Sequence, residues 1–456
     1  MSNRQIPPGP YSYPLLGNLL AVRHDPLGFL TACARTYGDV TRYRVLDFPV
    51  YLFSHPDAIE NVLVTQPQNF QKGRIAQASR SLFGNGLLLS EGAFWRRQRR
   101  LMQPALTSKR ASGYAPLVVG QTRRSLESWQ EGQTLDIHAE MVALTMQIIA
   151  QALFGARLED EVSQASAALK VFLQCFRAQV NTGMTLPERL PTPANLRLRR
   201  AIRDLDGIIY RMIQQRRLNP GAPDDLLAIL LNARDEDGRP MTDGQLRDEV
   251  LTLFIGGHET TATALAWTFY LLALHPQVEA CLVAELIQAL GGRAPTAGDL
   301  PHMPYAEKVV KEALRLYPPA WALTRLALQD CEIAGYTVPA GASVVMSQWV
   351  VQRDPRFFAR PDEFLPERWT DEFELRLPRF AYFPFGGGPR VCIGSSFAML
   401  EAVLVLAAVV QQFHLGLAPG HKVEPWATLV LRPKNGIMLE VERRRPYGFY
   451  KPLGSS

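Results

Sequence analysis

The stretch FPFGGGPRVCIG, residues 383–394, surrounds a single cysteine, Cys392, with four glycines and one arginine. Glycine costs conformational entropy on folding and is useful where something must approach the backbone closely. A cysteine in such a loop can be a metal ligand, a nucleophile or an inert filler. The rest of the sequence has to decide between these roles.

Composition places the chain among ordinary globular proteins. It has 456 residues, of which 47% are hydrophobic and 20% charged. A chain of this length buries a large core and can fold as one large domain or as several smaller ones. The net charge of +6 is a mild excess that does not by itself indicate nucleic acid, and we expect no nucleic-acid partner.

The five cysteines are scattered along the chain without any CxxC pair: Cys33, Cys175, Cys281, Cys331 and Cys392. This spacing predicts neither a disulfide framework nor a zinc site, and it is typical of a reducing compartment. The N-terminus lacks the apolar region of a signal peptide, and no run reaches the ~18 uncharged apolar residues of a membrane span. We therefore expect a cytoplasmic protein without a membrane span.

The order of patterns along the chain predicts one domain. Two alternating segments, 40–45 and 49–54, indicate a hairpin, so that about the first 60 residues are expected to be β-rich. A mostly helical pattern follows, then short strand-like pieces within 332–346 and an apolar helix over about 395–413. No linker, repeat or low-complexity tract divides residues 1–456.

A long helix is predicted to begin at MTDGQ, where Thr242 and Gln245 have the spacing of a capping box. It is expected to end before Pro276, after roughly 34 residues or about 50 Å. Inside it lies FIGGHETTATALAW, residues 254–267. Its paired glycines would let a large flat group lie against the helix, although an irregular helix with a solvated glutamate explains them as well.

Two further segments carry charge in regular patterns. EALR, residues 312–315, places Glu312 and Arg315 on one helix face as an ion pair. GAFWRRQRR, residues 92–100, places Trp95 and Arg99 on one face, where indole and guanidinium N–H groups suit the carboxylates of a ligand.

Together these segments resemble the cytochrome P-450 superfamily of heme-thiolate monooxygenases, in order and over nearly the whole chain. The cysteine loop fits F-G-x-G-x-R-x-C-x-G, GGHETT fits the oxygen-activating helix, EALR fits the buried E-x-x-R, PERW (366–369) fits its partner segment, and Trp95 with Arg99 fits W-x-x-x-R. The resemblance implies a mainly helical fold with small β-sheets (α+β). It also places the heme between the long helix and the helix that follows the cysteine loop.

The resemblance also assigns residues to roles. Cys392 is expected to be the axial thiolate ligand of heme b. The other residues expected to contact the cofactor are Trp95, Arg99, Gly257, Arg325, Phe385, Gly386, Arg390 and Gly394. Thr260 and Glu259 are expected to deliver protons to bound dioxygen, with Gly257 making room for it. Glu312, Arg315 and Arg368 are expected to form a buried, structural charge network.

The substrate is expected to be an apolar small molecule, with fatty acids or terpenoids favoured and steroids or polyketides still open. The candidate pocket residues are Leu87, Leu88, Phe254, Ala264, Ala320 and Trp321. No flavin or nicotinamide fingerprint is present, so electrons are expected from a separate ferredoxin with its reductase, or from a flavoprotein reductase. We expect a monomer whose basic residues Arg96, Arg97, Arg100, Lys109 and Arg110 steer an acidic redox partner.

Two departures from the family pattern are Trp369, where Phe is commoner, and Gln352, where His is usual. Neither is expected to affect the iron chemistry. Two other functions stay open at this point. One is a peroxide-driven or redox-neutral heme-thiolate enzyme, and the other is a heme-binding sensor or electron carrier.

Overall fold

The computed structural model describes residues 6–78, 80, 84–155, 192–218 and 225–444, together with Gln164, Val171, Gln174 and Leu190. Cys175 lies outside the described residues. The α-helices are α1 (Leu19–His24), α2 (Pro26–Tyr37), α3 (Pro56–Glu60), α4 (Arg74–Ala78), α6 (Gly92–Met102), α7 (Ser108–Gly113), α8 (Ala115–Leu126), α9 (Ile137–Phe154), α11 (Pro193–Leu218), α12 (Leu226–Asn232), α13 (Asp243–Leu274), α14 (Pro276–Leu290), α15 (Pro304–Leu316), α16 (Gln348–Val351), α17 (Asp371–Arg376) and α18 (Ser395–Val410).

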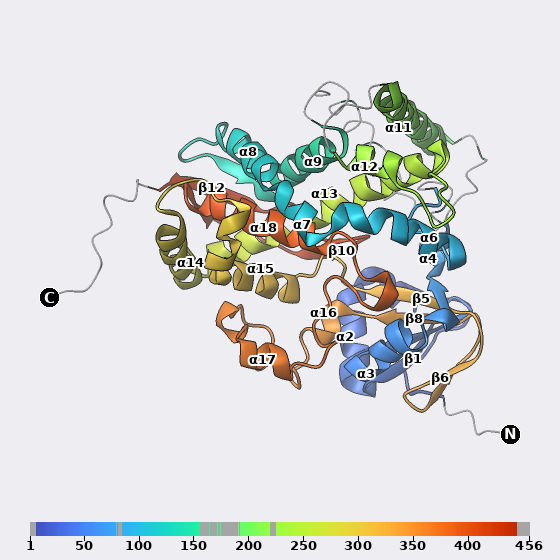
Figure 1. Ribbon diagram of the computed structural model, residues 1–456. Coiled ribbons are helices and arrows are strands. Elements are labelled where there is room, and N and C mark those ends of the chain that lie inside the picture. Colours follow the sequence, from blue (N-terminus) through green and yellow to red (C-terminus); the bar gives the residue numbers. More distant parts are fainter. Residues whose placement is uncertain are drawn as a thin grey trace.

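The strands are short and belong to four sheets. They are β1 (Val40–Val45), β2 (Phe48–Phe53), β3 (Phe70–Lys72), β4 (Thr134–Asp136), β5 (Leu323–Ala327), β6 (Cys331–Ile333), β7 (Tyr336–Val338), β8 (Ser343–Met346), β9 (Phe413–Leu417), β10 (Pro425–Ala427), β11 (Leu431–Pro433) and β12 (Met438–Arg443). The largest sheet has the order β1-β2-β8-β5-β3. In Figure 1 this sheet lies with α2 and α3 at the end that carries the N-terminus, and the long helices form the rest of the molecule.

The predicted hairpin is confirmed, and the strand-like pieces expected within 332–346 correspond to β6, β7 and β8. β1 and β2 pair antiparallel, and β2 then pairs in parallel with β8, so that Phe53 lies opposite Met346. The expected helix over 395–413 ends at Val410, and Phe413 begins β9. The first part of the chain therefore completes its sheet only with residues from far along the sequence.

The long helix α13 runs through the centre of the helical part and confirms the capping prediction. The Thr242 hydroxyl accepts from the Gln245 N–H (3.2 Å), and the Gln245 side chain accepts from the Thr242 N–H (2.8 Å). Its last helical residue is Leu274, two positions before Pro276. Buried residues of α13 share one core cluster with those of α8, α9, α15 and α18. The helix that bears Thr260, α13, and the helix that follows Cys392, α18, therefore belong to the same packed core.

Among the described residues, α9 is the one helix that is by itself long and apolar enough to cross a membrane. The helices α13 and α14 have enough apolar length only when taken together, and they are bent by 110° at their junction. Two thirds of the α9 window (67%) is buried inside the protein. That burial is what a core helix of a globular protein requires.

Candidate active site

The cysteine loop is held by its own backbone. The Cys392 N–H donates to the Phe385 carbonyl (2.9 Å), and the Gly386 N–H donates to the Phe383 carbonyl (2.9 Å). Gly394 caps α18, so the positive end of that helix lies beside the sulfur. The Cys392 residue is exposed, yet loss of surrounding water raises its pKa, while the Gly394 N–H and the Arg99 guanidinium oppose this shift.

Gly388 is the position in the loop where glycine is most clearly required. The group that approaches its backbone belongs to the protein and not to a cofactor. Gly388 has a φ of +65°, and a Cβ there would lie 1.9 Å from the Leu63 carbonyl oxygen. Only glycine combines this left-handed conformation with so close a backbone approach. The loop is thereby seated on residues 61–65.

Two residues of α6, Trp95 and Arg99, contact the cysteine loop. An Arg99 Nη donates to the Val391 carbonyl (2.8 Å), and the Arg390 guanidinium lies 4.4 Å from the centre of the Trp95 ring. Arg390 also donates to the Ser90 carbonyl (3.0 Å) and pairs with Glu91. Trp95, Arg99 and Arg390 therefore converge on one side of the loop.

A cluster of cations extends from Arg390 onto the large sheet. Arg325 on β5 lies opposite Lys72 on β3 in the strand register. Burial, followed by the positive charges of Arg325 and Arg390, lowers the pKa of Lys72 to about 7. Burial and Arg390 likewise lower the pKa of Arg325 to about 10. Such mutual repulsion is relieved when an anion binds among the cations.

These observations test whether the residues fit a heme. The thiol of Cys392 supplies a soft ligand for iron, and the cations Lys72, Arg325 and Arg390 supply partners for two propionates. Among the described residues, no three or more His, Cys, Asp or Glu side chains gather in a metal-binding cluster. The donor set therefore fits a heme held by a single cysteine and by cationic side chains.

Thr260 and Glu259 occupy different surroundings on α13. The half-buried Thr260 donates its hydroxyl hydrogen to the Gly256 carbonyl (2.7 Å). Glu259 is 3% exposed, and its Oε1 lies 3.2 Å from an Nη of Arg432 on β11. In this conformation the carboxylate therefore faces a cation of β11, whereas we expected it to relay protons above the iron.

The two glycines before His258 also differ from expectation. A Cβ at Gly257 would meet Ile149 of α9 at 2.8 Å, so packing of the two helices excludes a side chain there. A Cβ at Gly256 would meet nothing within 4 Å. The open side of the helix is therefore at Gly256. His258 is buried, with Nδ1 2.9 Å from the Phe254 carbonyl oxygen, in accord with a structural role.

The buried charge network around Glu312 forms as predicted. Arg315 contacts both Glu312 carboxylate oxygens at 2.9 Å, and Arg368 donates to Oε1 at 2.9 Å. Glu312 and Arg315 are fully buried. Gln352 is fully buried too: its side chain donates to the Leu314 and Arg315 carbonyls and accepts from the Phe383 N–H. Gln352 thus joins this helix to the start of the cysteine loop.

The candidate pocket residues divide into exposed and core positions. Leu88 is 44% exposed, and the neighbouring Leu87 is buried with its N–H donating to Glu249 (2.8 Å). Phe254 and Ala264 lie in core clusters. Ala320 is half-buried. Trp321 packs against a core cluster that includes Leu30 and Cys33 of α2, and its indole N–H donates to the Thr428 carbonyl (2.8 Å). Leu88 is therefore the candidate whose side chain is most available for a ligand.

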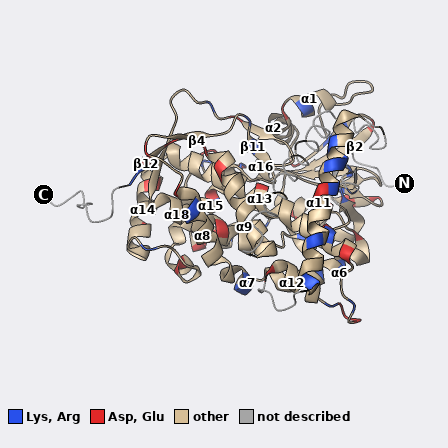
Figure 2. Ribbon diagram, turned by 90° about the horizontal axis from the view of Figure 1, so that it is seen from above, with Lys and Arg blue, Asp and Glu red and all other residues tan. Residues whose placement is uncertain are grey.

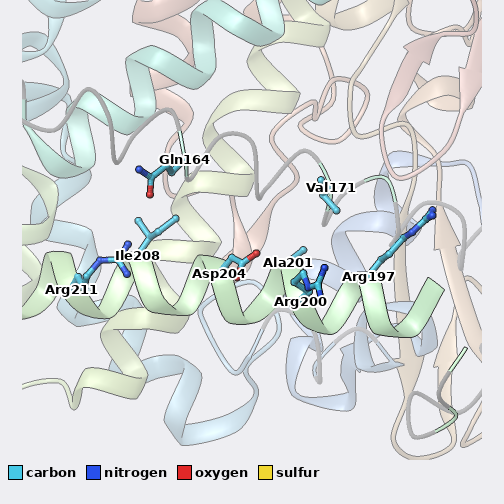
Figure 3. A pocket seen from close by; sticks show the side chains of 8 residues that line it. All are labelled: Gln164, Val171, Arg197, Arg200, Ala201, Asp204, Ile208 and Arg211. Atoms are coloured by element: carbon cyan, nitrogen blue, oxygen red, sulfur yellow. The ribbon is translucent and has the colours of Figure 1, made fainter. Parts of the chain in front are cut away.

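A separate groove of about 540 Å³ runs along α11 and does not include any predicted site residue. Figure 3 shows Arg197, Arg200, Asp204 and Arg211 of α11 facing it, and Figure 2 shows how densely basic residues follow this helix. Val171, Ala201 and Ile208 line the groove beside three arginines and an aspartate, so its lining mixes apolar and charged side chains. We expect fewer charges around an apolar substrate.

Two members of the predicted basic cluster are already paired. Arg97 contacts Asp235 at 2.7 Å, and Arg100 pairs with Glu236. Arg96 and Lys109 are exposed. The positive charge available to a partner is therefore smaller than the sequence suggested.

Sequence reasoning missed three functional candidates: Lys72, Glu91 and Arg432. None belongs to a motif, and each meets its partners through the fold. Glu91 directly precedes GAFW, and its carboxylate accepts from the Lys72 backbone N–H (2.7 Å) while pairing with Arg390. The one available signal was the position of Glu91 beside a motif.

The cysteine loop, the E-x-x-R network and the central helix together define a heme-thiolate protein, and comparison with known proteins gives the family. The cytochrome P450 family model matches residues 7–441, so the chain belongs to this family and is a monooxygenase. It is 38% identical to cyclooctatin synthase of Streptomyces melanosporofaciens, over 91% of each chain. It is 33% identical to pentalenene oxygenase of Streptomyces avermitilis, covering 96% of this chain and 97% of that one.

Solved structures agree with this assignment. The heme domain of cytochrome P450DA superposes with a TM-score of 0.88 at 29% identity, covering 97% of this chain and 99% of that one. The retinoic acid-bound cyanobacterial CYP120A1 superposes with a TM-score of 0.86 at 28% identity, covering 97% and 100%. The predicted fold is therefore confirmed.

Proposed function

We propose that this cytochrome P450 holds heme b on Cys392 and hydroxylates or epoxidises a terpenoid. The observation that carries the proposal is the exposed residue Cys392 in a loop flanked by the cations Arg99 and Arg390. When bound, the heme would supply the binding and reductive activation of dioxygen at its iron.

The chain's own residues would divide the remaining work. Arg99, Arg390, Arg325 and Lys72 would pair with the propionates and orient the cofactor. Thr260 would hold a water molecule by its hydroxyl, and Glu259 would pass protons from solvent to that water. Because Thr260 and Glu259 are both present, we favour oxygen activation over the peroxide-driven and electron-carrier alternatives.

The names of the relatives support the terpenoid class. Cyclooctat-9-en-7-ol 5-monooxygenase of Streptomyces melanosporofaciens is 37% identical over 90% of each chain, and pentalenene oxygenase is named for another terpenoid. The exposed Leu88 agrees with an apolar substrate. This ranks terpenoids ahead of fatty acids, which the sequence alone left equal.

A carbon monoxide difference spectrum of the dithionite-reduced protein, beside Cys392→Ser, tests the cofactor assignment. A strongly red-shifted Soret band that the variant loses would support thiolate ligation. An unshifted band in folded wild-type protein would refute it. Pentalenene, cyclooctat-9-en-7-ol and a long-chain fatty acid can then be compared by the spin-state shift that each induces, and a response to the fatty acid alone would overturn the terpenoid assignment.

We further propose that a separate ferredoxin or flavoprotein in the cytoplasm supplies the electrons. Arg96 and Lys109 would attract an acidic partner, since Arg97 and Arg100 are occupied by Asp235 and Glu236. Charge reversal at Arg96 and Lys109 should slow reduction by a surrogate ferredoxin and flatten its salt dependence. Unchanged rates would exclude this surface.

A further inference from the structure

A short hairpin, residues 234–240, lies against the basic helix α6. Arg234 and Pro240 pair across its base, and the Asp235 N–H donates to the Arg239 carbonyl (3.1 Å). Oδ1 of Asp235 in turn accepts from the Arg239 N–H (2.8 Å). The Asp235 side chain therefore supports the turn from within, and one of its oxygens is left to face α6.

The hairpin is anchored to α6 by an ion pair that is largely removed from water. Nε of Arg97 lies 2.7 Å from Oδ2 of Asp235, and an Arg97 Nη donates to the Pro240 carbonyl (3.2 Å). The side chains of Arg97 and Asp235 are 23% and 11% exposed. The hydrogen bond from Arg97, followed by that from the Arg239 N–H, holds the pKa of Asp235 below its ordinary value. Arg97 thus binds the hairpin at both ends of its turn.

A second ion pair, next to the anchor, is open to solvent. Glu236 follows Asp235 in the turn and pairs with Arg100 of α6. The Arg100 side chain is 60% exposed and that of Glu236 is 76% exposed. Such an exposed pair contributes little to stability, so that another carboxylate can take the place of Glu236 at small cost. The two pairs therefore differ: one anchors the hairpin, and the other can be exchanged.

The exchangeable cation belongs to the stretch of α6 that contacts the cysteine loop. Arg100 directly follows Arg99, which donates to the Val391 carbonyl beside Cys392. The exposed Arg96 lies four residues before Arg100, so that both project from one face of the helix. An acidic surface that reaches both arginines would form two ion pairs close to the loop that carries the cysteine.

We propose that the hairpin 234–240 is a built-in competitor for an acidic redox partner. Glu236 occupies Arg100 in the free protein, and a carboxylate of the partner displaces it, while Asp235 keeps the hairpin in place on Arg97. This inference rests on the proposed redox surface and adds a regulatory contact to it. An acidic protein that engages Arg96 but cannot reach Arg100 gains only one ion pair, so the competitor favours a partner that fits both.

The first test measures the binding of an acidic surrogate ferredoxin to the heme-loaded protein by isothermal titration calorimetry. Glu236→Gln frees Arg100 and should tighten binding about two- to fivefold at an ionic strength of about 0.01 M. This gain should vanish near about 1 M, where the Debye length falls to ~3 Å. An affinity that is unchanged or weaker in Glu236→Gln at low ionic strength would overturn the proposal.

Asp237→Asn is the matched control for net charge. It removes a carboxylate from the neighbouring position, but Asp237 lies 3.6 Å from Arg239 of the same hairpin and is not paired with α6. Its gain in affinity should therefore be smaller than that of Glu236→Gln. Equal gains in the two variants would show that only the overall charge matters, and the competitor role of Glu236 would be excluded.

A double-mutant cycle then identifies the cation for which Glu236 competes. In the Arg100→Gln background, Glu236→Gln should give no more than the gain of Asp237→Asn, because no guanidinium remains to be freed. A full gain in that background would show that Glu236 acts on another group.

The outcomes separate this inference from the proposal on which it rests. If charge reversal at Arg96 and Lys109 weakens ferredoxin binding but Glu236→Gln behaves like Asp237→Asn, only the competitor role is overturned. If charge reversal leaves binding unchanged, the proposed redox surface is overturned and the inference falls with it.

Discussion

The indole N–H of Trp369 donates a hydrogen bond of 2.9 Å to Oε2 of Glu312, deep inside the protein. The same carboxylate accepts from Arg315, Arg368 and the Leu365 N–H. A phenylalanine at position 369 could not donate. The departure from the family pattern therefore adds a donor to the network.

Trp369→Phe should destabilise the protein by about 1–3 kcal/mol, because a buried carboxylate loses one of its donors. Urea unfolding of the heme-loaded protein measures this difference. Trp426→Phe is the control, since Trp426 is 39% exposed and its replacement should cost little. Equal stabilities of Trp369→Phe and the wild type would mean that the indole hydrogen bond contributes nothing.

Lys72 is expected to favour the cofactor at the expense of the heme-free fold. Its folded pKa of about 7 lies below its ordinary value of 10.5, so the unfolded chain binds more protons between these pH values. Stability of the heme-free protein should therefore rise with pH from about 7 to 10.5, and the full penalty should apply below pH 7.

Lys72→Met should then raise the unfolding free energy of the heme-free protein at pH 6 and weaken its retention of heme. Urea denaturation and a heme titration measure the two effects. A variant that loses heme-free stability at this pH would contradict the assignment of Lys72 to the strained cation cluster.

Glu249 fastens the loop that carries Leu88 and should make stability depend on pH. Its carboxylate accepts from the Leu87 N–H and from the Gln98 side chain, both at 2.8 Å, and burial raises its pKa to about 7. Because the folded pKa exceeds the ordinary 4.5, the folded state binds more protons between pH 4.5 and 7. The contribution of Glu249 to stability should fall across that window as pH rises, by at most about 1.4 kcal/mol per pH unit.

Comparison with Glu249→Gln isolates this contribution, since glutamine does not titrate. The stability difference between wild type and variant should move against the wild type from pH 5 to pH 8. A difference that is constant over this range would show that Glu249 has an ordinary pKa.

Gly388→Ala should disrupt the cysteine loop, because the new Cβ would lie 1.9 Å from the Leu63 carbonyl oxygen at a φ of +65°. Gly394→Ala is the matched variant in the same loop, where a Cβ would meet nothing within 4 Å. Thermal unfolding of the heme-free proteins should show a loss for Gly388→Ala only. If Gly394→Ala folds normally but binds heme weakly, the cradle for the cofactor is at Gly394; equal thermal behaviour of the two variants would contradict the packing argument.

Local signals in the sequence were sufficient for the elements that carry the chemistry. The capping box at Thr242 and Gln245 located the start of α13, and i,i+3 spacing located the Glu312–Arg315 pair. The alternating pattern located the β1–β2 hairpin. In each case the interacting residues are close in sequence, so spacing alone defines their geometry.

Contacts between distant segments were beyond such reasoning. Arg432 meets Glu259, and Gly388 meets Leu63, only after the whole chain has folded. The side of α13 on which Gly257 lies packs against Ile149 of another helix, and this contact is likewise long-range. Side-chain direction at these positions depends on tertiary packing, which a single sequence pattern does not encode.

The parallel pairing of β2 with β8 has a consequence for synthesis on the ribosome. Phe53 can pair with Met346 only after the ribosome has added about 290 further residues. At about 5–20 residues per second, this takes about 15–60 s. Throughout that interval the nascent hairpin β1–β2 exposes a strand edge that has no partner, which is a known risk for aggregation. Slower translation lengthens this exposure and should lower the soluble yield, whereas chaperones that shield exposed strands until β8 emerges should raise it.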